Sequence, residues 1–172
     1  TAPCGVFNPT MDNGCGVFGG STGVDIPAEF ARLRELSCFL ASALAPTGSA
    51  VLSGGTLTLV CLGAPVGGFM HVLYVDAVML EAADTLRVQN CDVQGTDVTL
   101  LINVVGSRVA FGRLSMTNLA DIRNNVVWNY PQATLLRAFD VQIEGLTLAP
   151  YAHFVSAGGQ IEGNTVARSW EG

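Results

Sequence analysis

The 172-residue sequence predicts a mainly β fold, a β-solenoid of stacked coils with one long α-helix packed alongside. One amphipathic stretch with helical period lies near the N-terminus, and short β-type runs separated by Gly, Asn and Asp fill most of the remainder. Near the C-terminus, the pattern of residues 143–149 also recurs at residues 161–167. A short fixed period is typical of solenoids, in which each coil buries its apolar face against the next. A β-sandwich is the structural alternative.

The helix is expected to begin after Asp25 and to end at about Ala45. Asp25 can cap the free amides of the first turn, Pro27 suits that turn, and Pro46 cannot continue a helix. Apolar side chains recur every three or four positions, at Phe30, Leu33, Leu36, Leu40 and Leu44. This stripe predicts that one side of the helix packs against a larger body.

Short strands follow the helix and are expected over residues 56–60, 70–75, 98–105, 125–130 and 146–149. Gly54-Gly55 and Gly67-Gly68 are expected to form turns between strands, because neither pair precedes a helix as a phosphate-binding loop would. The composition changes near residue 25. We therefore expect a Gly- and Cys-rich segment over residues 1–24 and a helix-plus-solenoid domain over residues 25–172.

The five cysteines suggest a disulfide framework without fixing its connectivity. Cys4 and Cys15 each begin the tetrapeptide Cys-Gly-Val-Phe, and the turn-rich stretch between them could close as a disulfide. Two buried free thiols are the alternative for this pair. Cys61 and Cys91 are a second candidate pair, which leaves Cys38 as an odd cysteine that stays buried or links to another chain.

The C-terminal repeat assigns residues to common columns of the stack. Residues 143–149 match residues 161–167 at an offset of 18, and residues 128–131 match residues 147–150 at an offset of 19. This alignment places Trp128, Thr147 and Thr165 in one column. Glu144 and Glu162 also become stacked neighbours, an arrangement more typical of a solvated turn than of a catalytic or calcium-binding pair.

The orientation of these columns follows from the alternation of side chains along a strand. Because Leu148 and Val166 align with Asn129, we expect that column to face inward, so that Trp128 and Tyr130 face outward. Outward aromatic rings could stack against sugar rings. The alternative is that these rings cover the helix or fill a corner of the solenoid.

Five segments, taken in order, resemble the choice-of-anchor A family. They are the helix with the following SGGTLTL (residues 53–59), TLLINVVG (99–106), NVVWNYPQAT (125–134), GLTLAPYA (145–152) and GQIEGNTVARS (159–169). The resemblance covers about residues 27–172. That family is similar to the ice-binding β-solenoids, which also pack one long helix along their coils. It implies an extracellular protein of a cell surface, coat or wall.

Composition and motifs restrict the function further. The net charge is −6 and all eight basic residues are Arg, so nucleic acid and anionic membranes are unlikely partners. Two distant histidines and the lack of a triad motif argue against an enzyme, and no cofactor or metal site is expected. We therefore expect a secreted structural or adhesive protein that assembles with like subunits. A polysaccharide-binding lectin and an ice-binding protein are the alternatives.

The candidate binding or assembly surface comprises five residues. They are Trp128, Tyr130, Thr147, Thr165 and Tyr151. Ice binding would require a flat, regular array of short side chains, and Thr56-x-Thr58 is the one Thr-x-Thr pair in the chain.

Overall fold

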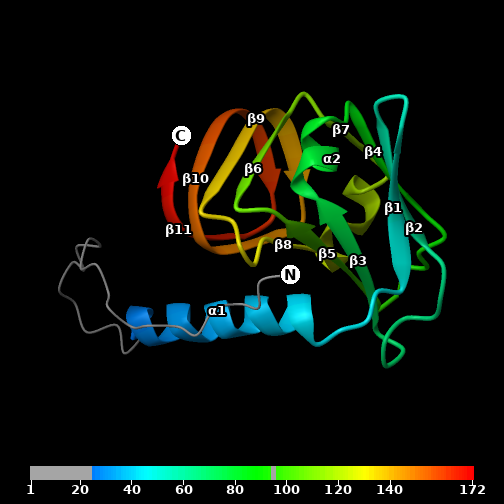
Figure 1. Ribbon diagram of the computed structural model, residues 1–172, viewed down its shortest axis with the longest axis horizontal. Helices are drawn as coiled ribbons and strands as arrows, with labels where there is room; N and C mark the ends of the chain where they lie inside the picture. The colour runs from blue at the N-terminus through cyan, green and yellow to red at the C-terminus, as the bar shows by residue number, and fades with distance from the viewer. Residues whose placement is uncertain (1–24, 94–95) are drawn as a thin grey trace.

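The computed structural model describes residues 25–93 and 96–172, which form a mainly β fold with few helices. One long helix, α1 (Ile26–Ser42), lies beneath a curled and largely parallel sheet (Figure 1). The prediction of parallel strands with one helix alongside is confirmed at this level, and a complete solenoid stays a prediction. Among the described strand pairs only β1–β2 is antiparallel, so the alternative of an antiparallel sandwich is wrong.

The elements follow one another with short connections. The strands are β1 (Gly48–Ser53), β2 (Thr56–Cys61), β3 (Met70–Asp76), β4 (Thr85–Gln89), β5 (Thr99–Val105), β6 (Arg108–Gly112), β7 (Ser115–Thr117), β8 (Val126–Asn129), β9 (Leu135–Glu144), β10 (Leu146–Glu162) and β11 (Thr165–Glu171). Two short helices, α2 (Ala77–Glu81) and η1 (Ala120–Asn125), interrupt them.

The strands stack in three columns. The first is the sheet β1-β2-β4-β7, and the larger curled sheet has the order β3-β5-β8-β10-β9-β6 with β11 against β10. Strand β10 belongs to two columns, because its first residues pair with β8 and its residues from His153 onward pair with β9. The second column is thus β3, β5, β8 and the start of β10, and the third is β6, β9 and the rest of β10.

The repeat predicted from the sequence sets the register of the last strands. Thr147 pairs with Trp128 on one side and with Thr165 on the other, as the offsets of 19 and 18 require. Glu144 pairs with Glu162 in the same way. The predicted alignment of these columns is therefore confirmed.

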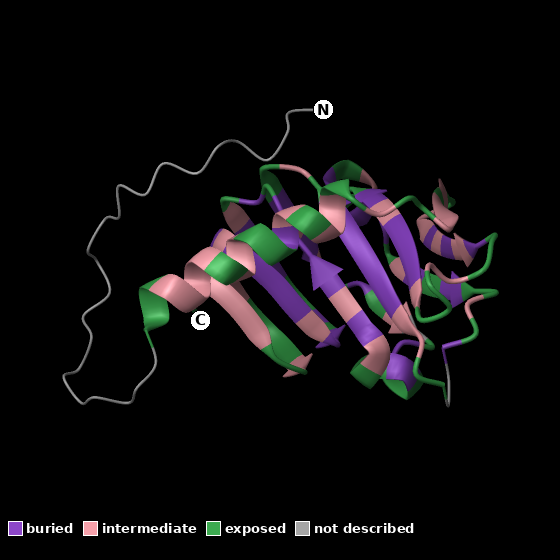
Figure 2. Cartoon of the chain, turned by 90° about the horizontal axis from the view of Figure 1, so that it is seen from below, coloured by how far each residue is buried: buried purple, intermediate pink, exposed green. Residues whose placement is uncertain are grey.

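Helix α1 begins as its sequence predicts. The Asp25 carboxylate accepts a hydrogen bond from the Ala28 amide at 3.1 Å, and the cap at the other end is Ala43. The predicted apolar stripe is only partly correct. Leu36 is 45% exposed, and the one fully buried residue of the helix is Ser37. Figure 2 shows exposed and half-buried residues alternating along the helix.

A column of polar side chains in the sheet holds α1 in place. Tyr74, Asn103 and Asn129 are successive partners across β3, β5 and β8. The Tyr74 hydroxyl lies 3.1 Å and 3.0 Å from the carbonyl oxygens of Ala41 and Leu44. Each of these contacts is made to the backbone at the C-terminal end of the helix.

The two asparagines continue this column toward the start of the helix. Asn103 donates to the Leu40 carbonyl at 3.1 Å, and Asn129 donates to the Ser37 carbonyl at 2.8 Å. Asn129 also donates to the side-chain oxygen of Asn103 at 2.7 Å and accepts from the Ser37 hydroxyl. Both asparagine side chains are fully buried, so each polar atom needs these partners.

The disulfide pairs are settled in part. Cys61 and Cys91 are bonded, with their Cα atoms 5.1 Å apart, which confirms this predicted pair. Cys38 is also disulfide-bonded, so its assignment as the odd cysteine is wrong. The predicted pair of Cys4 and Cys15 lies outside the described residues, as does the predicted segment over residues 1–24.

Replacing Asn129 should loosen the attachment of the helix. In Asn129→Ala the Ser37 carbonyl and the Asn103 side-chain oxygen lose their donors in a buried site, so the free energy of unfolding should fall by about 2–4 kcal/mol. Urea denaturation followed by circular dichroism measures this difference. Asn124→Ala, at an exposed position on η1, is the matched control and should change stability by less than about 0.5 kcal/mol. Equal effects of the two variants would contradict the role of the buried polar side chains Tyr74, Asn103 and Asn129 in holding α1.

Acid should destabilise the fold through His71. This side chain is buried beside the Thr47 hydroxyl, 3.3 Å from its Nδ1, and burial lowers the pKa of His71 below 6.5, against a smaller opposing effect of Asp92. In the unfolded chain, His71 takes up a proton near pH 6.5, whereas in the folded protein its imidazole is still neutral at that pH. The free energy of unfolding therefore falls as the pH falls below 6.5.

Melting temperatures measured across this pH range test the effect. His71→Gln should remove part of the loss, whereas His153→Gln, at the other histidine of the chain, should retain it. The slope against pH is the relevant quantity, because His71→Gln can also lower stability at every pH. An unchanged slope in His71→Gln would show that another group is responsible.

Candidate functional site

The five residues proposed from the sequence do not form a surface. Trp128 and Tyr130 are each 1% exposed, so the prediction that they face outward is wrong. The Trp128 indole Nε1 donates to the Glu144 carbonyl at 2.9 Å, and burial raises the pKa of the Tyr130 hydroxyl well above its ordinary value. Both rings belong to the interior of the stack, which corresponds to the alternative that they fill the solenoid.

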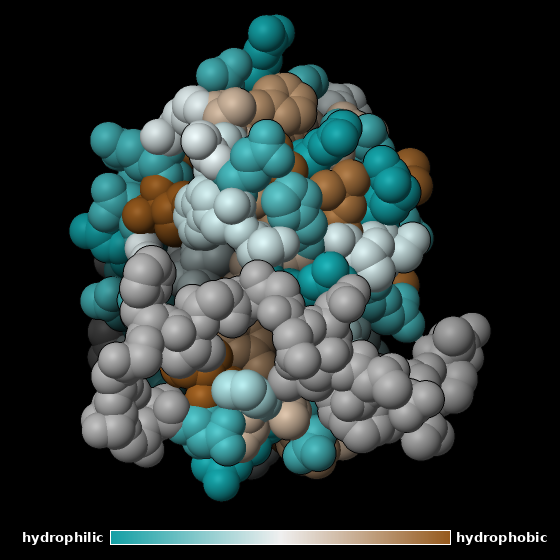
Figure 3. Space-filling view, turned by 90° about the vertical axis from the view of Figure 1, so that its left-hand side faces the viewer, coloured by the Kyte–Doolittle hydropathy of each residue, from teal (hydrophilic) through white to brown (hydrophobic). Residues whose placement is uncertain are grey.

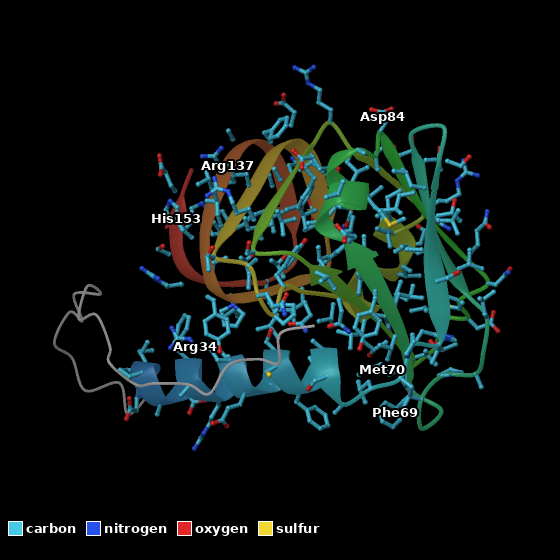
Figure 4. All side chains as sticks on the ribbon, in the orientation of Figure 1. Arg34, Phe69, Met70, Asp84, Arg137 and His153 are labelled. Carbon is cyan, nitrogen blue, oxygen red and sulfur yellow. A yellow bond between two sulfur atoms is a disulfide. The ribbon has the colours of Figure 1, made fainter. Side chains whose placement is uncertain are left out.

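The three remaining residues of this set lie in different environments. Thr147 is buried above Trp128, and Thr165 is half-buried in the same column. The hydroxyls of both threonines have no hydrogen-bond partner within the described residues. Tyr151 is half-buried, and the Arg34 guanidinium lies 5.2 Å from the centre of its ring. Figure 4 shows Arg34 between α1 and the sheet.

The outward orientation of Trp128 was predicted incorrectly because both sides of the second column are buried. Trp128 and Thr147 face the core, while Asn129 and Leu148 face α1. A parallel strand that is covered on both sides does not show the alternation of apolar and polar residues that marks an exposed face. The outward sides of the first and third columns are the two flat surfaces that α1 does not cover.

The first of these surfaces consists of the outward side chains of β1, β2, β4 and β7, and we call it the hydroxyl face. Its register rows are Ser53, Thr56, Thr85, Ser115; Val51, Thr58, Arg87; and Ser49, Val60, Gln89. The alternate residues of these strands, such as Leu57, Leu59 and Leu86, are fully buried, so the register forces the hydroxyl-bearing side chains outward.

The hydroxyl face offers hydrogen bonds to a ligand. Thr56, Thr58 and Thr85 form no hydrogen bond through their side chains within the described residues, so their donors and acceptors are available. Neighbouring strands lie about 4.8 Å apart and alternate residues along a strand about 6.7 Å apart, which makes the array regular. Arg87 is the one charged residue among these rows.

Sequence reasoning found only the Thr56-x-Thr58 part of this face. The register pairs Thr56 with Thr85 and Thr85 with Ser115, although each pair is widely separated along the chain. Each of these positions begins a hydroxyl–apolar–polar triplet. A search for repeats at the long interval from Thr56 to Thr85 would have detected them. The shorter repeat, in which residues 161–167 match residues 143–149, predicts a binding surface on the C-terminal strands instead.

The second uncovered surface consists of the outward side chains of β6, β9, β10 and β11, and we call it the arginine face. Its register rows are Arg108, Leu135, His153, Ser169; Ala110, Arg137, Val155, Glu171; and Gly112, Phe139, Ala157. Figure 4 shows Arg137 and His153 on the same side of the curled sheet. This surface has two arginines among mainly apolar side chains, whereas the hydroxyl face has one arginine among mainly hydroxyl-bearing side chains.

His153 links β10 to β11 on this face. Its Nδ1 lies 2.8 Å from the Ser169 hydroxyl and its Nε2 lies 3.3 Å from a carboxylate oxygen of Glu171. The order Ser–His–acid is that of a catalytic triad, in which the acid is buried and orients the imidazole. The Glu171 side chain is 72% exposed, so water competes for its contact with the ring. We therefore interpret these three side chains as a polar link between β10 and β11.

The stacked glutamates are paired with an arginine. The Arg123 guanidinium lies 3.9 Å from Glu144 and 3.4 Å from Glu162, and Glu144 is buried. The Gln142 amide donates to the other Glu144 oxygen at 2.7 Å. Within the described residues no group of three or more His, Cys, Asp or Glu side chains gathers as metal ligands.

The described strands thus form a largely parallel stack braced by α1, with two faces that α1 does not cover. A family model described as "Putative Ice-binding-like adhesive domain" matches residues 5–172 of the chain. The chain therefore belongs to this family of ice-binding-like adhesive domains, which suggests an adhesive role. The narrower resemblance to choice-of-anchor A domains stays a prediction.

Other comparisons add no relative. No curated protein and no solved structure gives a significant match to the chain. In the part of the chain that the structure describes, no helix has the length and apolarity needed to span a membrane.

Proposed function

We propose that the protein is a non-catalytic extracellular adhesive module that attaches to an ordered polysaccharide surface through its hydroxyl face. The observation that carries this proposal is the array of Ser and Thr hydroxyls in register across β1, β2, β4 and β7. The polysaccharide of a wall or coat repeats its own hydroxyls along each chain. Two periodic arrays of donors and acceptors can form many weak hydrogen bonds together, and their sum gives adhesion.

The rigidity of the face supports this proposal. The backbone of the face is fixed by strand pairing, and its inward residues are buried in the core, so few side chains lose freedom on binding. β-branched Thr side chains are also restricted in rotation before any ligand arrives. Such preorganisation favours binding to a flat solid over binding to a small molecule in a cleft.

The extracellular location and the non-catalytic role rest on separate observations. The Cys61–Cys91 disulfide joins the end of β2 to the residues after β4, which is typical of proteins that fold in an oxidising compartment. Catalysis needs a base positioned beside a nucleophile, and the rows of the hydroxyl face contain no His, Asp or Glu.

Replacing a hydroxyl in the centre of the hydroxyl face by a bulky charge should weaken adhesion. Thr58→Lys removes one hydroxyl and places a second long cationic side chain beside Arg87, so fewer hydroxyls reach a flat solid. We expect retention on cellulose or chitin to fall about tenfold, equivalent to about 1.4 kcal/mol. A pull-down assay with quantified bound and free protein measures the change.

The same substitution on α1 controls for added charge. Leu36→Lys lies at a half-exposed position on the helix and should bind both solids as the unaltered protein does. Loss of retention in both variants would contradict a role for the hydroxyl face. Absence of retention on either solid, together with inhibition of ice recrystallisation that Thr58→Lys abolishes, would assign the face to ice instead.

Assembly with like subunits is the second candidate function. Within the described residues, β11 pairs with β10 on one side only, and Trp170 on this last strand is 50% exposed while its ring packs against Phe154 at a centroid distance of 4.7 Å. An edge strand presents unpaired backbone groups to any strand that can approach. Figure 3 shows this side of the molecule, where separate apolar patches lie among polar side chains.

Self-association should depend on this edge. We expect concentration-dependent oligomers in sedimentation velocity and a shift toward monomer in Trp170→Lys, because a charge on an edge strand opposes pairing. Leu36→Lys again provides the control and should sediment unchanged. A protein that sediments as a monomer at every concentration would rule out assembly through β11 and would leave the hydroxyl-face proposal unaffected.

A further inference from the structure

The arginine face contains a pocket where the strand column meets a helix. The pocket has a volume of about 230 Å³ and is lined by Glu81, Arg108, Val109, Ala110, Leu135 and Arg137. In the third column, α2 packs beside β6 in the position that a further strand would occupy. A helix does not continue the flat surface of the strands, so a depression forms at the junction.

Two guanidinium groups share this pocket. Arg108 pairs with Leu135 and Ala110 pairs with Arg137, so the two arginines are diagonal neighbours on the outward side of adjacent strands. Both are exposed, and within the described residues neither forms an ion pair or a hydrogen bond. Two like charges on diagonal positions of paired strands contribute no favourable contact to the fold.

Three of the other arginines have acidic partners. Arg32 pairs with Glu29, Arg113 with Asp140, and Arg123 with Glu144 and Glu162. The chain has 14 acidic and 8 basic residues, so partners are abundant. Arg87 and Arg168 also form no ion pair within the described residues, but Arg108 and Arg137 are diagonal neighbours that line one pocket, so they concentrate positive charge where an anion can bind.

An aromatic platform lies beside the two arginines. Phe139 is 44% exposed and occupies the same strand and the same side as Arg137, two positions further on. Its ring lies over Gly112, since a Cβ atom built there would overlap the ring. The absence of a side chain at Gly112 thus lets the ring lie flat with one side open to solvent, the geometry that a sugar ring prefers for stacking.

We propose that this pocket binds a carboxylated sugar unit of an acidic polysaccharide, an assignment that rests on the proposed adhesion to polysaccharide and names its second binding face. Arg108 and Arg137 hold the carboxylate, because a planar guanidinium matches the two oxygens of a carboxylate. Glu81 accepts hydrogen bonds from the sugar hydroxyls. The neighbouring sugar unit stacks on Phe139, about 6.7 Å along the strand from Arg137.

Binding of oligogalacturonate by the full chain, measured by calorimetry, tests the assignment. Arg108→Gln and Arg137→Gln should each weaken binding about tenfold, and Arg137→Lys should restore only part of it, because an ammonium keeps the charge without the planar fork. Phe139→Ala should also weaken binding. Higher ionic strength should reduce the affinity of the unaltered protein.

Arg32→Gln is the matched control, since it removes the same charge from an exposed arginine on α1, outside both proposed binding faces. It should leave oligogalacturonate binding unchanged. Equal weakening in all three glutamine variants would show attraction by net charge and overturn the pocket. Equal binding of methyl-esterified galacturonate would overturn the role of the carboxylate, and tighter binding of dextran sulfate would overturn the choice of a carboxylated ligand.

The two faces separate this inference from the proposed function. Retention on neutral cellulose or chitin depends on Thr58, whereas oligogalacturonate binding depends on Arg108 and Arg137. Galacturonate binding without retention on neutral solids would contradict the role of the hydroxyl face and support the pocket. Retention on neutral solids without any galacturonate binding would do the reverse.

Discussion

The structure depends on a match between the pitch of an α-helix and the spacing of stacked strands. A helical turn rises about 5.4 Å and neighbouring strands lie about 4.8 Å apart, so α1 presents backbone carbonyls to successive strands at nearly the same interval. The Tyr74 hydroxyl contacts the carbonyls of Ala41 and Leu44, whereas Asn103 and Asn129 contact one carbonyl each, those of Leu40 and Ser37. These contacts fix the helix over the second column, so the outward side chains of the first and third columns are left uncovered by α1.

Features encoded in adjacent residues could be predicted from the sequence. The cap at Asp25, the glycine turn at Gly54-Gly55 and the repeat shared by the last strands each depend on local residue types, and the structure confirms all three. The direction of the Trp128 column could not be predicted in this way. The sequence predicts that Asn129 faces inward and Trp128 outward, but Asn129 is buried against Ser37 of α1, far away along the chain, and Trp128 is buried on the opposite side of the strand.

The candidate surfaces differ in how far the sequence could predict them. The hydroxyl face has a signal, the triplets that begin at Thr56, Thr85 and Ser115. Its interval is long because each circuit passes through the other columns, by β3 and α2 in the first circuit and by β5 and β6 in the second. The pocket of the arginine face has none, since Arg108 and Arg137 come together through the pairing of β6 with β9, and Glu81 comes from α2. The ring of Phe139 also gains its orientation from Gly112 on another strand. Such sites arise from register rather than from motif.

The three columns present different kinds of side chain on their outward sides. The second column uses polar groups to fix the helix, the first presents uncharged hydroxyls, and the third combines cations with an open aromatic ring. A lattice of neutral sugars offers hydroxyls and weak dipoles, which suits the first column, whereas an acidic polymer offers localised charge, which suits the third. Arg108 and Arg137 concentrate positive charge beside one pocket, because the two side chains are diagonal neighbours on paired strands. Under the two proposals made above, one scaffold would contact a neutral and an acidic polysaccharide with separate faces.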